Sequence, residues 1–132
     1  MKKSILVSGG TKGIGRAIVE RFAKEGFSVF TCSRNEQDLQ DLKQSLEQAH
    51  PGISVYTQVA DLSKKEEVLS FAESVKALGI PDVIVHNTGV FLPGSLHEEA
   101  DGNLEFLMDT NLYSAYYLTR AFAKELTNIV QD

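Results

Sequence analysis

Near its N-terminus the sequence reads Ser8-Gly9-Gly10-Thr11-Lys12-Gly13-Ile14-Gly15. This glycine-rich stretch follows the apolar run Ile5-Leu6-Val7 and opens a segment with apolar residues at helical spacing, namely Ile14, Ala17, Ile18 and Phe22. A strand, a glycine turn and a helix in this order present backbone N–H groups and the positive end of a helix dipole to a phosphate. The stretch therefore predicts a nucleotide-binding turn, and a glycine turn without a ligand is the alternative.

The spacing of the glycines separates two kinds of phosphate-binding turn. Gly9, Gly13 and Gly15 form the pattern G-x-x-x-G-x-G, which differs from the G-x-G-x-x-G of the usual dinucleotide fingerprint. The spacing of Gly10 and Gly15 also matches the start of a phosphate loop. Arg16-Ala17 then stands where that loop needs Lys and Ser or Thr to bind phosphates and magnesium. The sequence therefore argues against a nucleoside triphosphatase.

Length and composition limit the classes of protein. The chain has 132 residues, of which 42% are hydrophobic and 23% charged, and this predicts a single domain over residues 1–132 with a substantial core. A net charge of −5 without a basic run argues against nucleic acid as a partner. Cys32 is the only cysteine and the three histidines are scattered, so we expect neither a disulfide nor a metal site. No apolar run suits a signal peptide or a membrane span, so we expect a cytoplasmic protein without a membrane partner.

Predicted strands and helices alternate along the chain. We expect strands over residues 4–8, 27–33, 54–59 and 82–86, and helices over 13–25, 36–49, about 64–78 and from about 103 onward. Ser63 and Glu66 have the spacing of a capping box at the third helix. Helical spacing predicts buried stripes that include Leu78 in the third helix and Leu112 in the last. Repeated β-α-β units predict an α/β fold with a doubly wound, Rossmann-type parallel sheet in the strand order 3-2-1-4, with helices on both faces. Val83-Ile84-Val85 would then form an uncovered edge, so we expect the sheet to be incomplete on that side.

Four motifs in the expected order resemble those of the short-chain dehydrogenase/reductase family. The glycine turn is the first, and Ala60-Asp61-Leu62 after the third strand is the second. His86-Asn87-Thr88-Gly89 is similar to the family's Asn-Asn-Ala-Gly turn, and Asn111 is similar in position to the asparagine of its catalytic tetrad. The resemblance covers essentially this whole chain but only about the first half of a family member. It implies hydride transfer between a nicotinamide cofactor and a small-molecule carbonyl or alcohol substrate.

Basic residues at the expected cofactor site favour NADP(H) over NAD(H). Where an NAD-binding protein usually has an acidic residue for the ribose hydroxyls, the second strand ends in Ser33 and Arg34. The planar guanidinium of Arg34 and the ammonium of Lys12 suit a 2′-phosphate, and the family resemblance implies the same preference. The alternative is that Arg34 only opens a solvated helix.

The resemblance also implies roles for residues at the other strand ends. Asp61 would hydrogen-bond the adenine amino group, Asn87 would bridge strand ends, and Gly89 would let the backbone pass close to the ribose on the nicotinamide side. Alternatively, Asp61 is a turn or cap residue. The expected cofactor-binding residues are Gly9, Thr11, Lys12, Gly13, Ile14, Gly15, Ser33, Arg34, Asp61, Leu62, Asn87 and Gly89.

The catalytic chemistry that the resemblance implies is incomplete in this sequence. Asn111 would help to hold a water near the active-site lysine, and a helix cap or a solvent-facing asparagine is the alternative. The family's Ser and its Tyr-x-x-x-Lys lie beyond that asparagine. No tyrosine in this sequence is followed four positions later by a lysine. The residues at that spacing after Tyr56, Tyr113, Tyr116 and Tyr117 are Ala60, Tyr117, Arg120 and Ala121, respectively. We therefore expect residues 1–132 alone to be inactive and marginally stable. A non-catalytic NAD(P)-binding or regulatory module is the alternative to the enzyme.

In the family the long helix that bears this asparagine commonly packs against its copy in another subunit. We therefore expect a homo-oligomer formed through the Asn111-bearing helix. Apolar surface for this contact would come from Tyr113, Tyr116, Tyr117 and Phe122, which alternatively belong to the core. These residues do not identify the substrate, because substrate specificity in this fold comes from loops after the later strands.

Overall fold

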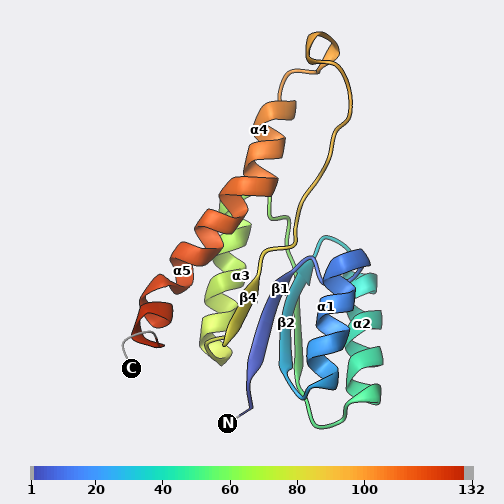
Figure 1. Cartoon of the computed structure of the whole chain (residues 1–132), viewed down its shortest axis with the longest axis vertical. Coiled ribbons are helices and arrows are strands. Elements are labelled where there is room, and N and C mark those ends of the chain that lie inside the picture. Colours follow the sequence, from blue (N-terminus) through green and yellow to red (C-terminus); the bar gives the residue numbers. More distant parts are fainter. Residues whose placement is uncertain (1, 130–132) are drawn as a thin grey trace.

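Four parallel strands form one sheet in the order β3-β2-β1-β4 in the computed structural model, which describes residues 2–129 (Figure 1). The strands are β1 (Ser4–Ser8), β2 (Ser28–Ser33), β3 (Val55–Val59) and β4 (Val83–Val85). The central strand β1 pairs with β2 on one side and with β4 on the other. The predicted order is therefore confirmed, while the last three strands are slightly shorter than expected.

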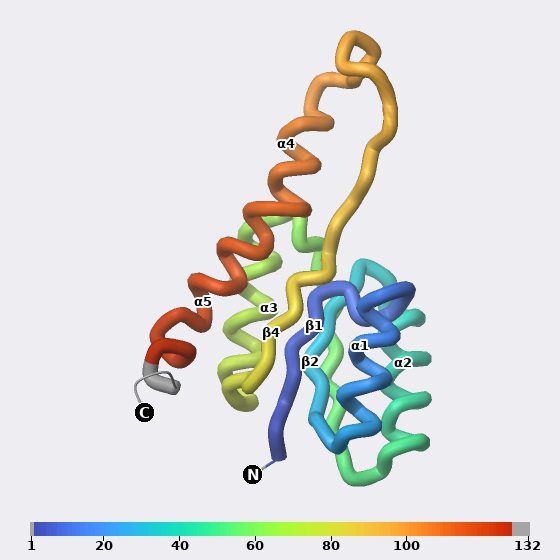
Figure 2. Tube along the Cα trace, viewed as in Figure 1, coloured from blue at the N-terminus to red at the C-terminus, as the bar shows by residue number. Residues whose placement is uncertain are grey.

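The helices lie between and after the strands. They are α1 (Gly13–Lys24), α2 (Glu36–Ala49), α3 (Lys65–Leu78), α4 (Asn103–Met108) and α5 (Ser114–Ile129), with a 3₁₀ turn η1 (Leu96–Glu98) and a π turn η2 (Asp109–Tyr113). The turn η2 joins α4 to α5 without a break, so the expected last helix is one rod with a π turn inside it (Figure 2). Its signature bond runs from the Ser114 N–H to the Asp109 carbonyl.

Each face of the sheet is covered by two helices, as the sequence predicts. Ile5, Val7 and Val29 point to one face, where they pack with residues of α1 and α2. Leu6 and Phe30 point to the other face and pack with residues of α3 and α5. This alternation follows from the pleat of a strand, in which successive side chains point to opposite sides.

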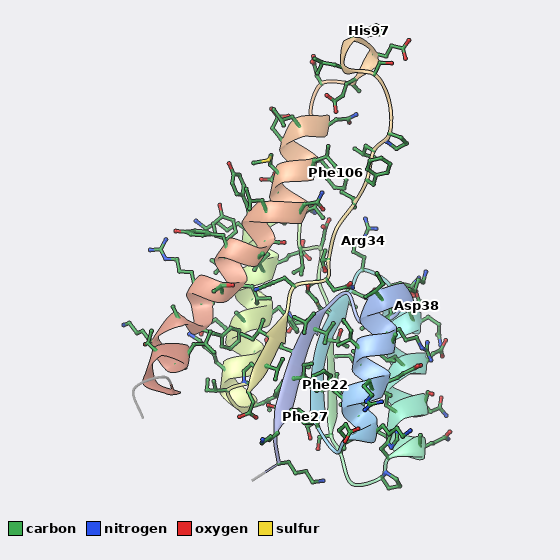
Figure 3. All side chains as sticks on the ribbon, in the orientation of Figure 1. Phe22, Phe27, Arg34, Asp38, His97 and Phe106 are labelled. Atoms are coloured by element: carbon green, nitrogen blue, oxygen red, sulfur yellow. The ribbon has the colours of Figure 1, made fainter. Side chains whose placement is uncertain are left out.

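Phe22 and Phe27 form an edge-to-face aromatic pair with ring centroids 4.9 Å apart (Figure 3).

Three apolar residues that the helical spacing assigns to buried faces are exposed instead. Ile14 is 76% exposed in α1, Leu78 is 62% exposed at the end of α3, and Leu112 is exposed in η2. The buried stripe of α1 consists of Gly15, Val19 and Ala23, and that of α5 includes Leu118 and Phe122. Phe122 therefore belongs to the core, whereas Tyr113 and Tyr116 are exposed. Periodicity indicates an amphipathic helix, but adjacent stripes overlap, and docking on the sheet decides which of them is buried.

The predicted capping box at the start of α3 is wrong. The N-cap is Lys64, and its side chain makes no capping hydrogen bond within the described chain. Ser63 instead donates from its hydroxyl to Asp61 Oδ1 at 2.7 Å, and the Asp61 N–H donates to Glu67 Oε1 at 2.9 Å. The carboxylate of Asp61 thus competes for the hydroxyl that would otherwise cap the helix.

The strand β4 forms one edge of the sheet, and its three residues are half-buried. After β4 the chain runs out beyond the sheet through residues 86–102 and returns along α4 (Figures 1 and 2). Phe91 and Leu96 on this excursion are exposed. Within residues 2–129 no helix combines the length and apolar character needed to cross a membrane.

Candidate functional site

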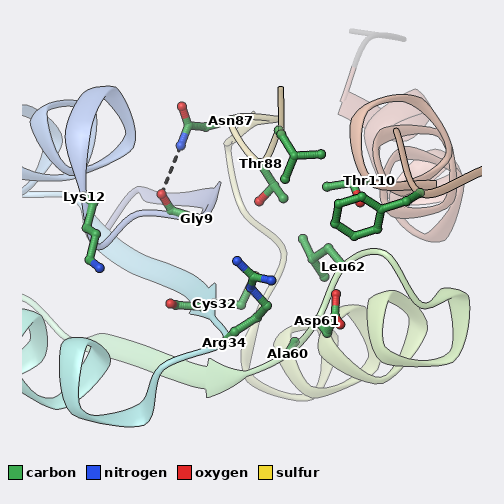
Figure 4. Close-up of a pocket in the computed structure, with 14 residues that line it drawn as sticks. Gly9, Lys12, Cys32, Arg34, Ala60, Asp61, Leu62, Asn87, Thr88 and Thr110 are labelled. Carbon is green, nitrogen blue, oxygen red and sulfur yellow. Dashed lines mark hydrogen bonds between the residues drawn. The ribbon is translucent and has the colours of Figure 1, made fainter. Parts of the chain in front are cut away.

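A pocket of about 280 Å³ lies at the carboxyl ends of the four strands (Figure 4). This is the edge at which doubly wound sheets bind ligands, because successive loops leave a crevice there. The pocket brings together eight of the expected cofactor residues: Gly9, Lys12, Ser33, Arg34, Asp61, Leu62, Asn87 and Gly89. Thr11 lines an adjoining hollow with Lys12 and Arg34. Gly13, Ile14 and Gly15 do not line either hollow and form the first turn of α1.

The glycine turn is anchored to the sheet by a residue that sequence reasoning missed. Thr31 in β2 is fully buried, and its hydroxyl donates to the Val7 carbonyl at 2.7 Å and accepts from the Gly10 N–H at 3.0 Å. Gly9 and Gly13 have φ values of +70° and +57°, which residues with a Cβ rarely adopt. The turn is therefore held in one conformation before any ligand binds.

Asn87 joins the ends of β1 and β4. Its side-chain Nδ2 donates to the Gly9 carbonyl at 3.0 Å, and the Ser8 hydroxyl accepts from the backbone N–H groups of Asn87 and Thr88 at 3.0 Å each. A Cβ at Gly15 would collide with the Asn87 amide and the Gly9 carbonyl, so only glycine fits there. These contacts close the turn against the last strand. Sequence reasoning also missed Ser8, whose signal is its place as the first polar residue after an apolar strand.

The N-terminus of α1 is open to an anion. Its N-cap residue, Lys12, makes no side-chain capping bond within the described chain, and the first turn carries no acidic residue. A Cβ at Gly13 would meet nothing within 4 Å. The first backbone N–H groups of a helix lack intrahelical partners, and the helix dipole favours negative charge beside them. This end of the helix therefore suits a phosphate.

Two basic residues flank the pocket on the side of β2. Arg34 is exposed and lines the pocket together with Lys12 (Figure 4). Lys12 Nζ lies 3.3 Å from Asp38 Oδ2. The N-cap of α2 is Asn35, whose side chain accepts from the Asp38 N–H at 3.0 Å. Arg34 therefore directly precedes the N-cap residue of α2 and is not itself the cap.

Asp61 is ionised at neutral pH. Burial raises the pKa of this carboxyl group, but the two hydrogen bonds from Ser63 and the charges of Lys64 and Arg34 outweigh burial and leave the pKa below its ordinary value. The bonds from Ser63 end on Oδ1, at 3.0 Å from the N–H and 2.7 Å from the hydroxyl. Asp61 therefore shapes its own turn and also presents a negative charge to the pocket.

Asn111 does not line the pocket, but its side chain is hydrogen-bonded to Val90, which does. Its side chain accepts from the Val90 N–H at 2.7 Å and donates to the Val90 carbonyl at 2.9 Å. A Cβ at Gly89 would approach Asn111 Oδ1 to 3.2 Å. The Asn111 side chain is thus used as a tie between η2 and the loop after β4, and not as a helix cap. π turns are frequent at functional sites, which matches the position of η2.

Two further titratable side chains, Cys32 and His86, lie near the strand ends. Burial raises the pKa of the Cys32 thiol to about 12, so this residue stays protonated and unreactive at neutral pH. Burial lowers the pKa of His86, whose Nε2 lies 2.8 Å from the Thr119 hydroxyl. Within residues 2–129 no group of three or more His, Cys, Asp or Glu side chains is placed to hold a metal ion.

The residues present fit a dinucleotide. The glycine turn leaves room for a pyrophosphate at the start of α1, and basic residues stand on one side of the pocket. On the other side the buried hydroxyl of Thr110 lines the pocket and has no hydrogen-bond partner among the described residues. Sequence reasoning missed Thr110 and the nearby Phe106, for which their closeness to Asn111 in the chain was the available signal.

Comparisons with known proteins agree with this geometry. The family described as short chain dehydrogenase matches residues 3–131. The curated relatives include senescence-associated protein 13 of Arabidopsis thaliana, 37% identical over 117 residues, and a tropinone reductase homolog of the same plant, 38% identical over 119 residues. Each alignment covers 87% of this chain and 43% of the relative, so the chain spans less than half the length of these curated relatives.

Solved structures give the same result. A variant of actinorhodin polyketide ketoreductase with NADPH is 31% identical with a TM-score of 0.84, over 93% of this chain and 47% of that one. L-Sorbose reductase from Gluconobacter frateurii, complexed with NADPH and L-sorbose, is 30% identical with a TM-score of 0.85, over 92% of this chain and 46% of that one. The fold, the site and the match over residues 3–131 lead to one conclusion: the chain belongs to the short-chain dehydrogenase family.

Proposed function

We propose that the complete polypeptide carrying this chain is an NADP(H)-dependent oxidoreductase that transfers a hydride between the nicotinamide and a carbonyl or alcohol substrate. Family membership and the NADPH in two similar solved structures support this proposal. The observation that carries it is the pocket at the strand ends, where an uncapped, glycine-rich helix N-terminus adjoins Lys12 and Arg34. The bound nicotinamide would supply the hydride or accept it.

Each part of the pocket has a role in this proposal. Backbone N–H groups of the glycine turn and of the first turn of α1 hold the pyrophosphate, and these segments contain Gly9, Thr11, Gly13, Ile14 and Gly15. Lys12 and Arg34 bind the 2′-phosphate, which gives NADP(H) its advantage over NAD(H). Ser33, Asp61 and Leu62 border the adenosine, Asn87 and Gly89 border the ribose on the nicotinamide side, and Asn111 supports the catalytic residues.

Catalysis needs residues that residues 1–132 do not contain. No Tyr-x-x-x-Lys occurs in this sequence, and a phenol with a pKa near 10 needs a nearby cation to act as an acid or base at neutral pH. Residues 1–132 on their own are therefore expected to bind the nucleotide weakly and to turn nothing over. Proton transfer in the complete polypeptide would then fall to residues outside this sequence.

We propose a homo-oligomer that forms through the rod of η2 and α5, because Leu112, Tyr113 and Tyr116 are exposed on it. A cytoplasmic location stays a prediction from the sequence. The small-molecule substrate of the proposed reaction is a carbonyl compound or an alcohol.

The test uses the complete polypeptide and a panel of ketones and aldehydes with NADPH. We expect NADPH oxidation that depends on the carbonyl compound, and tighter binding of NADPH than of NADH by titration calorimetry. Binding without turnover on a broad panel would indicate a non-catalytic NADP(H)-binding module. If neither NADPH nor NADH binds at millimolar concentration, the proposal is wrong.

A further inference from the structure

Ser114 closes the π turn η2 with its side chain as well as its backbone. Its N–H bonds to the carbonyl of Asp109, five positions back, whereas in an α-helix it would bond to the carbonyl of Thr110. The Ser114 side chain is buried, and its hydroxyl donates to that Thr110 carbonyl at 2.6 Å. The hydroxyl therefore replaces the donor that the π turn takes away from Thr110.

The π turn also affects which side of the rod faces the rest of the protein. Buried or half-buried residues recur at every fourth position, at Phe106, Thr110, Ser114, Leu118 and Phe122. In a regular α-helix such a stripe drifts by about 40° at each step, and by about 160° after four steps. A π turn holds more residues per turn and takes up part of this drift. Phe106 and Thr110 can therefore line the pocket while the last two residues of the stripe pack in the core.

The same π turn carries Asn111, whose side chain makes two hydrogen bonds to the backbone of Val90. The direction of that side chain depends on the π turn staying in place, and Val90 lines the pocket. We propose that Ser114 is a positioning residue, whose hydroxyl stabilises the π turn and, through Asn111, fixes Val90 in the wall of the pocket. This inference rests on the proposed function, because it assigns to Ser114 a part in holding the reacting groups in place.

The experiment compares Ser114→Ala with the wild type in the complete polypeptide. The variant removes a donor from a buried carbonyl, so we expect the Val90 N–H to exchange about fivefold faster, the effect of one lost hydrogen bond. The kcat for NADPH oxidation with a carbonyl substrate should fall by a similar factor. The KM for NADPH should stay close to the wild-type value, because Lys12 and Arg34 lie outside the rod. A general loss of stability would not divide kcat from KM in this way.

Two further variants serve as controls. The Ser74 hydroxyl also donates to a carbonyl four positions back, that of Ser70 at 3.0 Å, but it does so within the regular helix α3. Ser74→Ala should therefore change neither the exchange of the Val90 N–H nor kcat. Ser114→Thr keeps a hydroxyl that can reach the carbonyl four positions back, so it is expected to preserve both.

The double variant Ser114→Ala with Asn111→Ala tests whether Ser114 acts through Asn111. Its kcat should equal that of Asn111→Ala alone, and a product of the two separate losses would overturn the inference. Unchanged exchange of the Val90 N–H in Ser114→Ala would overturn it as well. If the wild-type polypeptide oxidises no NADPH with any carbonyl compound, the proposed enzyme activity fails, and the exchange of the Val90 N–H then decides this inference by itself.

Discussion

The side-chain amide of Asn111 pairs with the backbone of Val90 in both directions, accepting from its N–H at 2.7 Å and donating to its carbonyl at 2.9 Å. The two residues are 21 positions apart, and they connect the π turn η2 to the loop after β4. Because Val90 lines the pocket, this pair determines where one wall of the pocket stands. Through these two hydrogen bonds the Asn111 side chain positions a residue that lines the candidate site.

Removing the amide should loosen that wall. For Asn111→Ala in the complete polypeptide we expect the free energy of unfolding to fall by about 1–2 kcal/mol, since two hydrogen bonds are lost. Asn111→Asp keeps the acceptor but not the donor, so its loss should be smaller. Urea unfolding measures the stability, and amide hydrogen exchange measures the protection of the Val90 N–H. An equally protected Val90 in Asn111→Ala would contradict this account.

Gly15 should not tolerate a side chain. Gly15→Ala places a methyl group against the Asn87 amide and the Gly9 carbonyl, so we expect a loss of stability of about 1–3 kcal/mol and weaker NADPH binding. Gly79→Ala is the control, because Gly79 has an extended φ of 162° and an added Cβ would meet nothing within 4 Å. Thermal unfolding and calorimetric titration compare the two variants. Equal effects of the two substitutions would show that crowding at Gly15 is unimportant.

Asp38 should weaken the binding of a 2′-phosphate, because it already pairs with Lys12 at 3.3 Å. For Asp38→Asn we expect NADPH to bind about two- to fivefold more tightly, the range for an exposed ion pair, with NADH unchanged. Lys12→Ala should weaken NADPH and spare NADH. Lys24→Ala, in the last turn of α1, serves as the control for loss of one positive charge. The difference between variants should shrink at high salt, because exposed charges are screened. A gain for both cofactors in Asp38→Asn would show that Asp38 does not act on the 2′-phosphate.

The histidine at the end of β4 should make stability depend on pH. Burial lowers the pKa of His86 in the folded protein, so in the acidic range below the ordinary histidine value, about 6.5, the unfolded state binds more protons. Stability therefore falls as the pH drops from about 6.5 toward the folded-state pKa of His86. His86→Asn should flatten this part of the curve. Urea unfolding of both proteins between neutral and mildly acidic pH measures it, and parallel curves would assign the pH dependence to other groups.

The strand order and the place of the pocket were predictable from sequence. Alternating strands and helices require parallel strands with right-handed crossovers, and these bring all the strand ends to one edge. The buried faces of the helices were less predictable. Ile14 and Leu78 fit an apolar stripe by spacing, yet both are exposed, because the contact with the sheet selects one of two overlapping stripes. Ser63 was misassigned for a similar reason, since Asp61 takes the hydroxyl that the capping pattern assigns to the helix.

By itself, the sequence determined the β-α-β alternation, the glycine spacing and the basic pair at Lys12 and Arg34, because these properties are local along the chain. Only the tertiary structure decided which polar groups meet. Thr31 reaches the Val7 carbonyl across 24 positions and Ser8 holds the Thr88 N–H across 80, while Thr110 faces the pocket without a partner among the described residues. Hydrogen bonds depend on distances and directions that exist only after the strands have paired and the helices have docked, so no local pattern contains them.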